Sequence, residues 1–222
     1  QAQRGDASEP GAEAGVTPDP RKLSFPKLAV VPRFADRAAL NNGIAVHLLE
    51  DPELPVVRFG AFVRAGAVFD PGEKAGRTWL TSATMRQGGG ALLDGDALDE
   101  ELDFLGAELN WSSEADAVQF WSWTLRRHLD RVVDLAADVL RRPAFPAPKF
   151  ELARQEMLEQ VRRQWDQPSN TAEIMFRRQL HGANHPWGRL STPATIGAVG
   201  PDDLSACHAA ALRPDRLVFA AA

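Results

Sequence analysis

Residues 75–90, AGRTWLTSATMRQGGG, carry the clearest structural signal of the chain. The stretch begins near a glycine, continues through small and apolar residues without a proline, and stops at three consecutive glycines. Glycine often follows the last turn of a helix, because it adopts a left-handed backbone conformation there without a steric penalty. The stretch therefore predicts a helix with a glycine-rich stop, and the neighbouring segments can be placed relative to it.

Two strands are predicted before this helix. Residues 40–51, LNNGIAVHLLED, place apolar side chains at alternate positions from Ile44 to Leu48, after an Asn-Gly turn signal. Residues 54–70, LPVVRFGAFVRAGAVFD, repeat the alternation over positions 57–63. A period of two places the apolar side chains on one face of a half-buried strand.

The segments after the helix complete the predicted fold. Leu98, Leu102 and Leu105 recur at helical spacing within residues 93–109, with acids in the first turn, where the helix dipole favours negative charge. The order of two strands, two helices, two strands, four helices and a strand fits an α+β domain. We expect a mixed, largely antiparallel sheet with helices packed on one face. The later predicted segments are strands at 106–113 and 116–125, helices at 125–143, 146–168, 170–180 and 201–211, and a strand at 215–222.

The bulk composition is that of an ordinary soluble globular protein, with 44% hydrophobic and 25% charged residues. The chain of 222 residues is long enough for one large domain or two small ones. A net charge of -5 gives no electrostatic reason to expect nucleic acid or anionic lipid as a partner. No apolar run approaches the roughly 18 residues needed to span a bilayer. The single cysteine, Cys207, excludes an internal disulfide and is predicted to be a small buried hydrophobe.

The N-terminal part differs in composition from the rest. The first 20 residues are rich in glycine, proline, alanine and acids, and they cannot bury enough surface to offset their ordering entropy. We therefore expect residues 1–36 to form a disordered or extended leader and residues 37–222 to form a single domain. The leader lacks the hydrophobic region of a signal peptide. As a linker left after removal of such a peptide, it suggests a bacterial periplasmic protein, with the cytoplasm as the alternative.

The order of these segments resembles one domain of the M16 metallopeptidases, the insulinase and mitochondrial processing peptidase group. The resemblance implies a LuxS/MPP-like metallohydrolase-type fold. It also implies that the chain is the N-terminal half of a protein about twice as long. Besides the segments quoted above, the landmarks are LGAELNWSS (105–113), LAADVLRRPAFP (135–146), HPWGR (185–189) and LRPDRLVFAA (212–221).

Active members of this family carry His-x-x-Glu-His on the helix that residues 75–90 resemble. Histidines at i and i+4 stand on one helical face and both reach one Zn²⁺ ion. The glutamate at i+3 takes a proton from the metal-bound water, and a further glutamate on a later helix is the third ligand. Aligning Gly76 and Gly88 with the family's glycines places Trp79 and Ala83 at the two histidine positions.

The other motif positions also lack the chemistry of a metal site. Ser82 stands at the glutamate position, and the third-ligand position falls at Glu159. A single carboxylate cannot hold zinc against water, and Ser82 has no adjacent base to make it a nucleophile. The resemblance therefore implies a lost zinc site, no cofactor and no catalytic residue, with Trp79 and Ala83 packed as core in the vacated space.

Residues 80–89, LTSATMRQGG, resemble the L-T-A-A-M-L-x-x-G run of the family's non-catalytic subunits. The resemblance implies an inactive subunit, not an enzyme by itself. Such a subunit pairs with an active M16 subunit as a heterodimer, or self-associates, and helps to enclose a peptide substrate. The alternatives are a purely structural subunit, like the core proteins of respiratory complexes, and an active zinc metallopeptidase whose ligands lie elsewhere in the chain.

The resemblance also implies a peptide-binding strand. In active relatives the substrate adds as a strand to a sheet edge, and the matching stretch here is Asn110, Trp111 and Ser112. Relatives carry a small residue where this chain has Trp111, so the indole either obstructs a peptide or grips one. In the alternative, Leu109 and Trp111 share one face of a half-buried strand and pack in the core or an interface.

Overall fold

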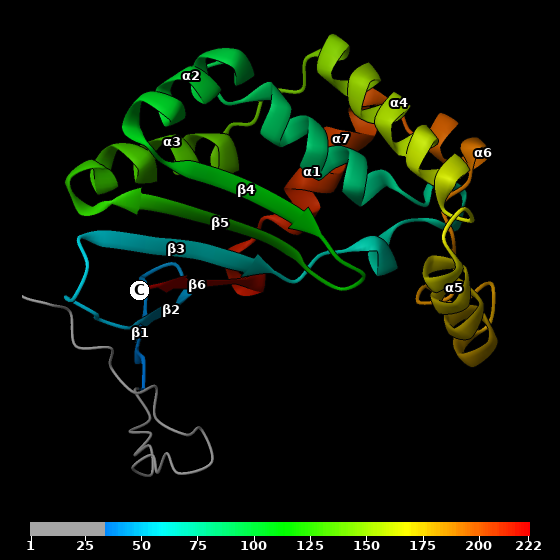
Figure 1. Ribbon diagram of the computed structural model, residues 1–222, viewed down its shortest axis with the longest axis horizontal. Coiled ribbons are helices and arrows are strands. Elements are labelled where there is room, and N and C mark those ends of the chain that lie inside the picture. Colours follow the sequence, from blue (N-terminus) through cyan, green and yellow to red (C-terminus); the bar gives the residue numbers. More distant parts are fainter. Residues whose placement is uncertain (1–33) are drawn as a thin grey trace, which may run out of the picture. The chain divides into compact units, whose positions relative to one another are not determined.

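The computed structural model describes residues 34–222, and a six-stranded sheet runs through this part of the chain (Figure 1). The strand order is β1-β2-β6-β3-β5-β4, and all neighbouring strands are antiparallel except the parallel pair β2 and β6. The predicted α+β class with a largely antiparallel sheet is confirmed. The strands are β1 (Asp36–Ala39), β2 (Ala45–Leu48), β3 (Val56–Val63), β4 (Glu108–Ser113), β5 (Val118–Leu125) and β6 (Leu217–Ala221).

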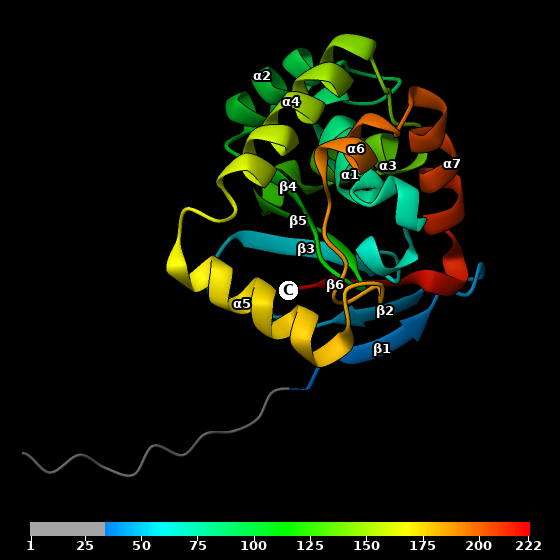
Figure 2. The same cartoon turned by 90° about the vertical axis from the view of Figure 1, so that its right-hand side faces the viewer.

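Helices cover one face of this sheet. The helices α1, α2, α3 and α7 lie on the same side of it, whereas α5 lies beside the sheet (Figures 1 and 2). In the described part of the chain, no helix is both long enough and apolar enough to cross a membrane. The helices of residues 34–222 are α1 (Arg77–Gly88), α2 (Gly95–Leu105), α3 (Leu129–Arg141), α4 (Ala147–Arg163), α5 (Pro168–His181), α6 (Pro193–Gly197) and α7 (Pro201–Ala211).

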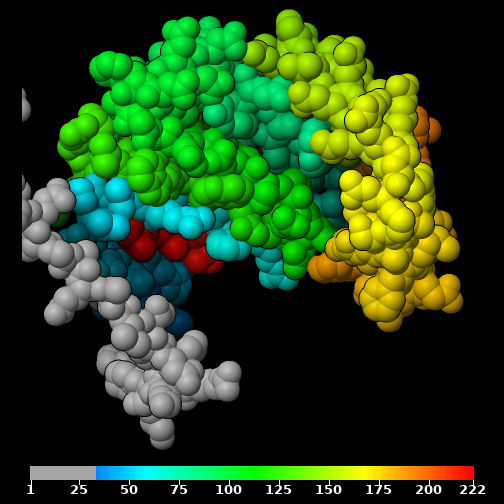
Figure 3. All heavy atoms as spheres, in the orientation of Figure 1, coloured from blue at the N-terminus to red at the C-terminus, as the bar shows by residue number. Residues whose placement is uncertain are grey.

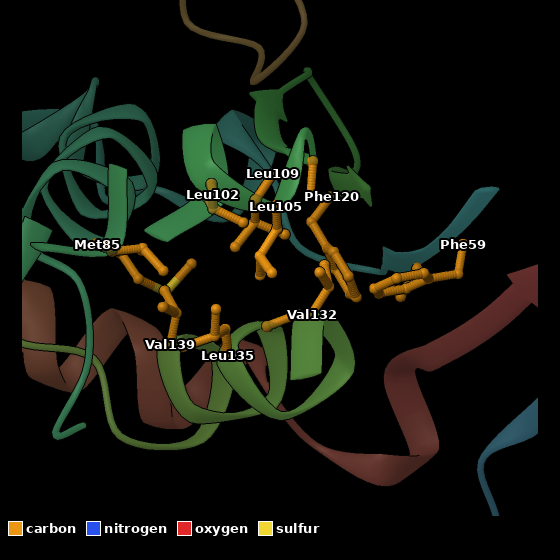
Figure 4. Close-up of a cluster of buried hydrophobic side chains, with 13 residues drawn as sticks. Phe59, Met85, Leu102, Leu105, Leu109, Phe120, Val132, Leu135 and Val139 are labelled. Carbon is orange, nitrogen blue, oxygen red and sulfur yellow. The ribbon is translucent and has the colours of Figure 1, made fainter. Parts of the chain in front are cut away.

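One buried cluster lies between the sheet and the helices α2 and α3 (Figure 4). The side chains of Leu98, Leu102 and Leu105, which the sequence places on one face of α2, are 1%, 2% and 7% exposed. They share this cluster with Phe120 of β5 and Leu135 of α3. Each fully buried leucine or phenylalanine contributes about 1.5 to 3 kcal/mol to stability, so the cluster fixes both helices on the sheet.

A second buried cluster packs α1 against three other helices. Leu80 of α1, Phe150 of α4, Ile196 of α6 and Leu204 of α7 are at most 1% exposed within it. The contacts hold α1 between α4 and α7. Cys207 of α7 is also buried, as the sequence predicts.

A buried carboxylate fixes the first turn of α1. Asp70 accepts hydrogen bonds from the backbone N–H groups of Gly76 (3.0 Å) and Thr78 (3.1 Å) and from the Thr78 hydroxyl (2.6 Å). The first N–H groups of a helix have no partner within the helix. Asp70 supplies acceptors for two of them from the preceding loop, and its own side chain is shielded from water.

The sequence does not predict β1 and α6. All four residues of β1 are exposed and show no apolar alternation, and the strand exists through its pairing with β2. Helix α6 has only five residues, held by the Thr192 side chain, which accepts a hydrogen bond from the Thr195 N–H, and by buried Ile196. The expected leader falls mainly on residues 1–33, outside the described residues, and its last residue, Asp36, is the first residue of β1.

Candidate functional site

Two positions of the metal-binding motif lie on the side of α1 that packs against α4. Trp79 and Ala83 are one helical turn apart, and both pack against the cluster that contains Phe150 and Met157 of α4. Apolar side chains therefore occupy this face, as expected from the sequence. The Trp79 side chain is only partly buried, so it covers the margin of the cluster and does not lie in its interior.

Ser82 is turned toward the sheet and is buried. Its hydroxyl donates a hydrogen bond to the Thr78 carbonyl oxygen, one turn earlier in α1, at 3.0 Å. The side chain lines a small apolar cavity of about 30 Å³, together with Met85, Trp111 and Phe120. Within residues 34–222 no histidine or carboxylate hydrogen-bonds to Ser82, so nothing activates it as a nucleophile.

Glu159, at the third-ligand position, is engaged by its own helix. Its carboxylate accepts a hydrogen bond from Arg163 Nε at 2.6 Å and lies 3.7 Å from Arg162 Nη1. The carboxylate that contacts α1 belongs to Glu156, which accepts a hydrogen bond from Gln87 Nε2 at 3.2 Å. The residue types alone do not predict this pair, although Gln87 stands one turn beyond the motif on the same helical face.

The side chains at the motif positions do not fit a zinc ion. Protein zinc sites use three or four ligands drawn from cysteine, histidine and carboxylates. The positions on α1 supply an indole, a methyl group and a hydroxyl that already donates to a backbone carbonyl. In residues 34–222, no group of three or more His, Cys, Asp or Glu side chains is placed to hold a metal ion. No hydrolytic step follows from these side chains.

The strand β4 forms an edge of the sheet and carries the predicted peptide-binding residues. Leu109 is buried, and Trp111 stacks on Phe120 with 5.6 Å between ring centroids. The expectation that Leu109 and Trp111 share the core face is therefore correct. Asn110 and Ser112 alternate with them, lie on the opposite face and are partly buried.

The surface near β4 is hollowed. The space-filling view shows a hollow that separates the β4–β5 hairpin, in green, from α4 and α5, in yellow (Figure 3). The hairpin and the two helices come from segments far apart in the sequence.

The substitution Trp79→Ala tests the packing of the motif face. We expect it to lower the free energy of unfolding by about 2 kcal/mol, because fully buried tryptophans cost about 3 to 5 kcal/mol on truncation and this ring is only partly buried. Urea unfolding measures the loss. Trp165→Ala, whose side chain lies 45% exposed just after α4, is the control and should cost less than about 0.5 kcal/mol. A Trp79→Ala loss as small as the control's would show that the ring does not stabilise the cluster.

Comparison with known proteins links the chain to one peptidase family. The family described as Insulinase (Peptidase family M16) matches residues 45–186. An uncharacterized zinc protease of Mycobacterium bovis is 26% identical over 206 residues, which cover 91% of this chain and 45% of the relative. Subunit 1 of the mitochondrial cytochrome b-c1 complex of Caenorhabditis elegans is 25% identical over 176 residues, 79% of this chain and 35% of that subunit.

A solved structure shares the fold. The peptidase M16 inactive domain from Pseudomonas fluorescens superposes with a TM-score of 0.78 and 25% sequence identity, covering 84% of this chain and 46% of that one. The chain thus spans less than half the length of these relatives.

Proposed function

The chain belongs to the insulinase family, peptidase family M16, and we propose that it is a catalytically inactive member that supports proteolysis by pairing with an active M16 subunit. The observation that carries the proposal lies on α1. The helix has a buried Asp70 cap and a glycine stop, but Trp79, Ser82 and Ala83 stand where the zinc ligands and general base would be. None of these three side chains can serve as a ligand of a catalytic zinc ion or as its general base.

Two further observations support an inactive role. The similar structure from Pseudomonas fluorescens is described as an inactive M16 domain. In this chain, the α4 carboxylates near α1 already accept hydrogen bonds from protein groups, Glu156 from Gln87 and Glu159 from Arg163. Without histidines across from them, these carboxylates do not make up a zinc site.

We also propose that β4 helps to enclose a peptide. An edge strand presents backbone N–H and C=O groups that have no partner within the sheet, and extended peptides bind to such edges through main-chain hydrogen bonds. The Trp111 ring is stacked on Phe120 beneath the strand, so it does not cover the backbone at the edge. Asn110 and Ser112 lie on the opposite face and would contact alternate side chains of the added strand.

Co-expression tests the proposed pairing. The chain is expressed with an intact-motif M16 relative from the same organism, and peptidase activity is measured for each alone and for the mixture. We expect the two proteins to co-elute and the activity to rise by about 10²-fold in the mixture, because completing the geometry of a misaligned site gains about that factor. An unchanged activity without co-elution would contradict the proposal.

A purely structural subunit is the second candidate. Its support is the similarity to subunit 1 of the C. elegans cytochrome b-c1 complex. The two candidates differ in the co-expression experiment. A structural subunit would leave the activity of the intact-motif relative unchanged, yet it would co-purify with other proteins of its own complex from the native organism.

A further inference from the structure

The edge of β4 is partly closed by a side chain from α1. β4 pairs with β5 alone, and antiparallel pairing leaves every second residue of an edge strand with its N–H and C=O directed away from the sheet. The carbonyl oxygen of Leu109 is directed this way, because it accepts a hydrogen bond from Arg86 Nε at 2.6 Å. By the same alternation, Trp111 and Ser113 are the next residues whose backbone groups face outward.

The Arg86 side chain is held at both ends of its guanidinium group. Nε donates to Leu109, and Nη2 donates to Asp99 Oδ1 of α2 at 2.7 Å. The Arg86 side chain is 26% exposed and that of Asp99 is 56% exposed, so the ion pair alone contributes little to stability. The contact with Asp99 fixes the orientation of the planar guanidinium group, so that Nε points at the strand edge.

We propose that Arg86 is a register stop for strand addition, so that a peptide on β4 pairs with Trp111 and Ser113 and not with Leu109. This inference rests on the proposed docking of a peptide at β4. An incoming peptide N–H that reached Leu109 would have to displace a charge-assisted hydrogen bond, which is stronger than the neutral bond it would form. The outward groups of Trp111 and Ser113 have no such competitor among the contacts of the described residues.

The register stop determines which part of a substrate lies beside α1. Leu109 and Arg86 lie toward the C-terminal end of α1, whereas the lost motif occupies its middle. A peptide that cannot extend past Trp111 is therefore positioned by backbone pairing at one end of the strand. Arg86 acts here through the strand edge and is a positioning residue.

The test uses a strand-forming probe and substitutions in the whole chain. The probe is a fluorescein-labelled decapeptide of alternating threonine and valine, with lysine at both ends, and its affinity is measured by fluorescence anisotropy. Arg86→Met keeps the aliphatic part of the side chain and removes the donors. Arg131→Met is the matched control, because Arg131 Nε pairs with Glu101 at 2.8 Å on the same side of the molecule without contacting β4.

We expect Arg86→Met to bind the probe about 3- to 30-fold more tightly than the unsubstituted chain, since it frees positions for one or two more backbone hydrogen bonds. Arg131→Met should bind like the unsubstituted chain. A series of probes, each N-methylated at one amide, locates the pairing. Binding to Arg86→Met should be weakened by methylation at one more probe amide than binding to the unsubstituted chain. A merely structural role of Arg86 would not produce this change.

Asp99→Asn is a second variant, which retains Arg86 and weakens the contact that orients its guanidinium group. It should strengthen probe binding in the same direction as Arg86→Met, by a smaller factor. Equal affinities and an unchanged methylation pattern in both variants would overturn the register stop and leave peptide docking at β4 intact. Absence of probe binding to all variants at millimolar concentration would instead overturn docking at β4, and the register stop with it.

Discussion

Asp70→Ala should lower the free energy of unfolding by about 3 to 5 kcal/mol. The substitution removes the acceptor of three hydrogen bonds and leaves the Gly76 and Thr78 N–H groups buried without this acceptor, whereas the Thr78 hydroxyl keeps a longer hydrogen bond to the Gly66 carbonyl oxygen at 3.3 Å. Each buried polar group left in this way costs about 1 to 3 kcal/mol. Urea unfolding followed by circular dichroism measures the loss, and α1, which joins both buried clusters, should be the helix most affected.

Asp94→Ala is the control for Asp70→Ala. Asp94 caps α2 through one hydrogen bond from the Ala97 N–H at 2.9 Å, and its side chain is exposed. An ordinary helix cap of this kind contributes about 1 kcal/mol. If Asp70→Ala cost no more than Asp94→Ala, water or neighbouring groups would be replacing the carboxylate, and the cap would not be what holds α1.

Restoring the motif should create a metal site. We expect the unsubstituted chain to hold no stoichiometric zinc and the variant with Trp79→His, Ser82→Glu and Ala83→His to hold about one zinc ion per chain. Histidines four residues apart on a helix reach one ion, and α4 packs against this face. Glu156 or Glu159 of α4 would then exchange its present hydrogen bond, with Gln87 or Arg163, for the metal ion. Elemental analysis after dialysis against zinc and then against metal-free buffer measures the content.

Two comparisons make the zinc experiment decisive. The single variant Trp79→His supplies only one histidine and should remain without stoichiometric zinc. A folded triple variant without zinc would show that these positions on α1 do not form the metal face of the family. Tight zinc binding by the unsubstituted chain would contradict the proposed inactivity and favour the active metallopeptidase.

The main elements of the fold could be predicted because each carries a local pattern. The alternation in β3 and the helical spacing of Leu98, Leu102 and Leu105 identify a strand and a helix before any contact is known. β1 has no such pattern, since its four residues are exposed and it is defined by pairing with β2. Helix α6 is too short for a periodic signal and depends on a cap and on buried Ile196.

Some features of the candidate site could also be predicted from the sequence, and others could not. The lack of zinc ligands at Trp79, Ser82 and Ala83 is visible from residue type alone, because an indole, a methyl group and an unassisted hydroxyl are poor zinc ligands in any fold. The partners of the α4 carboxylates were not predictable. Glu159 turned out to pair with arginines of its own helix, and Glu156 contacts α1 instead.

Local patterns in the chain are enough to predict the α+β class, the resemblance to the M16 family and the residue types at the positions that align with the family's zinc ligands. Two contacts could be seen only in the folded chain: Asp70 caps α1 from the preceding loop, and Arg86 reaches across to the Leu109 carbonyl. The difference lies in the range of the interactions. Strand and helix patterns record contacts between near neighbours, whereas these hydrogen bonds depend on how α1 is set against the loop and the sheet by two buried clusters.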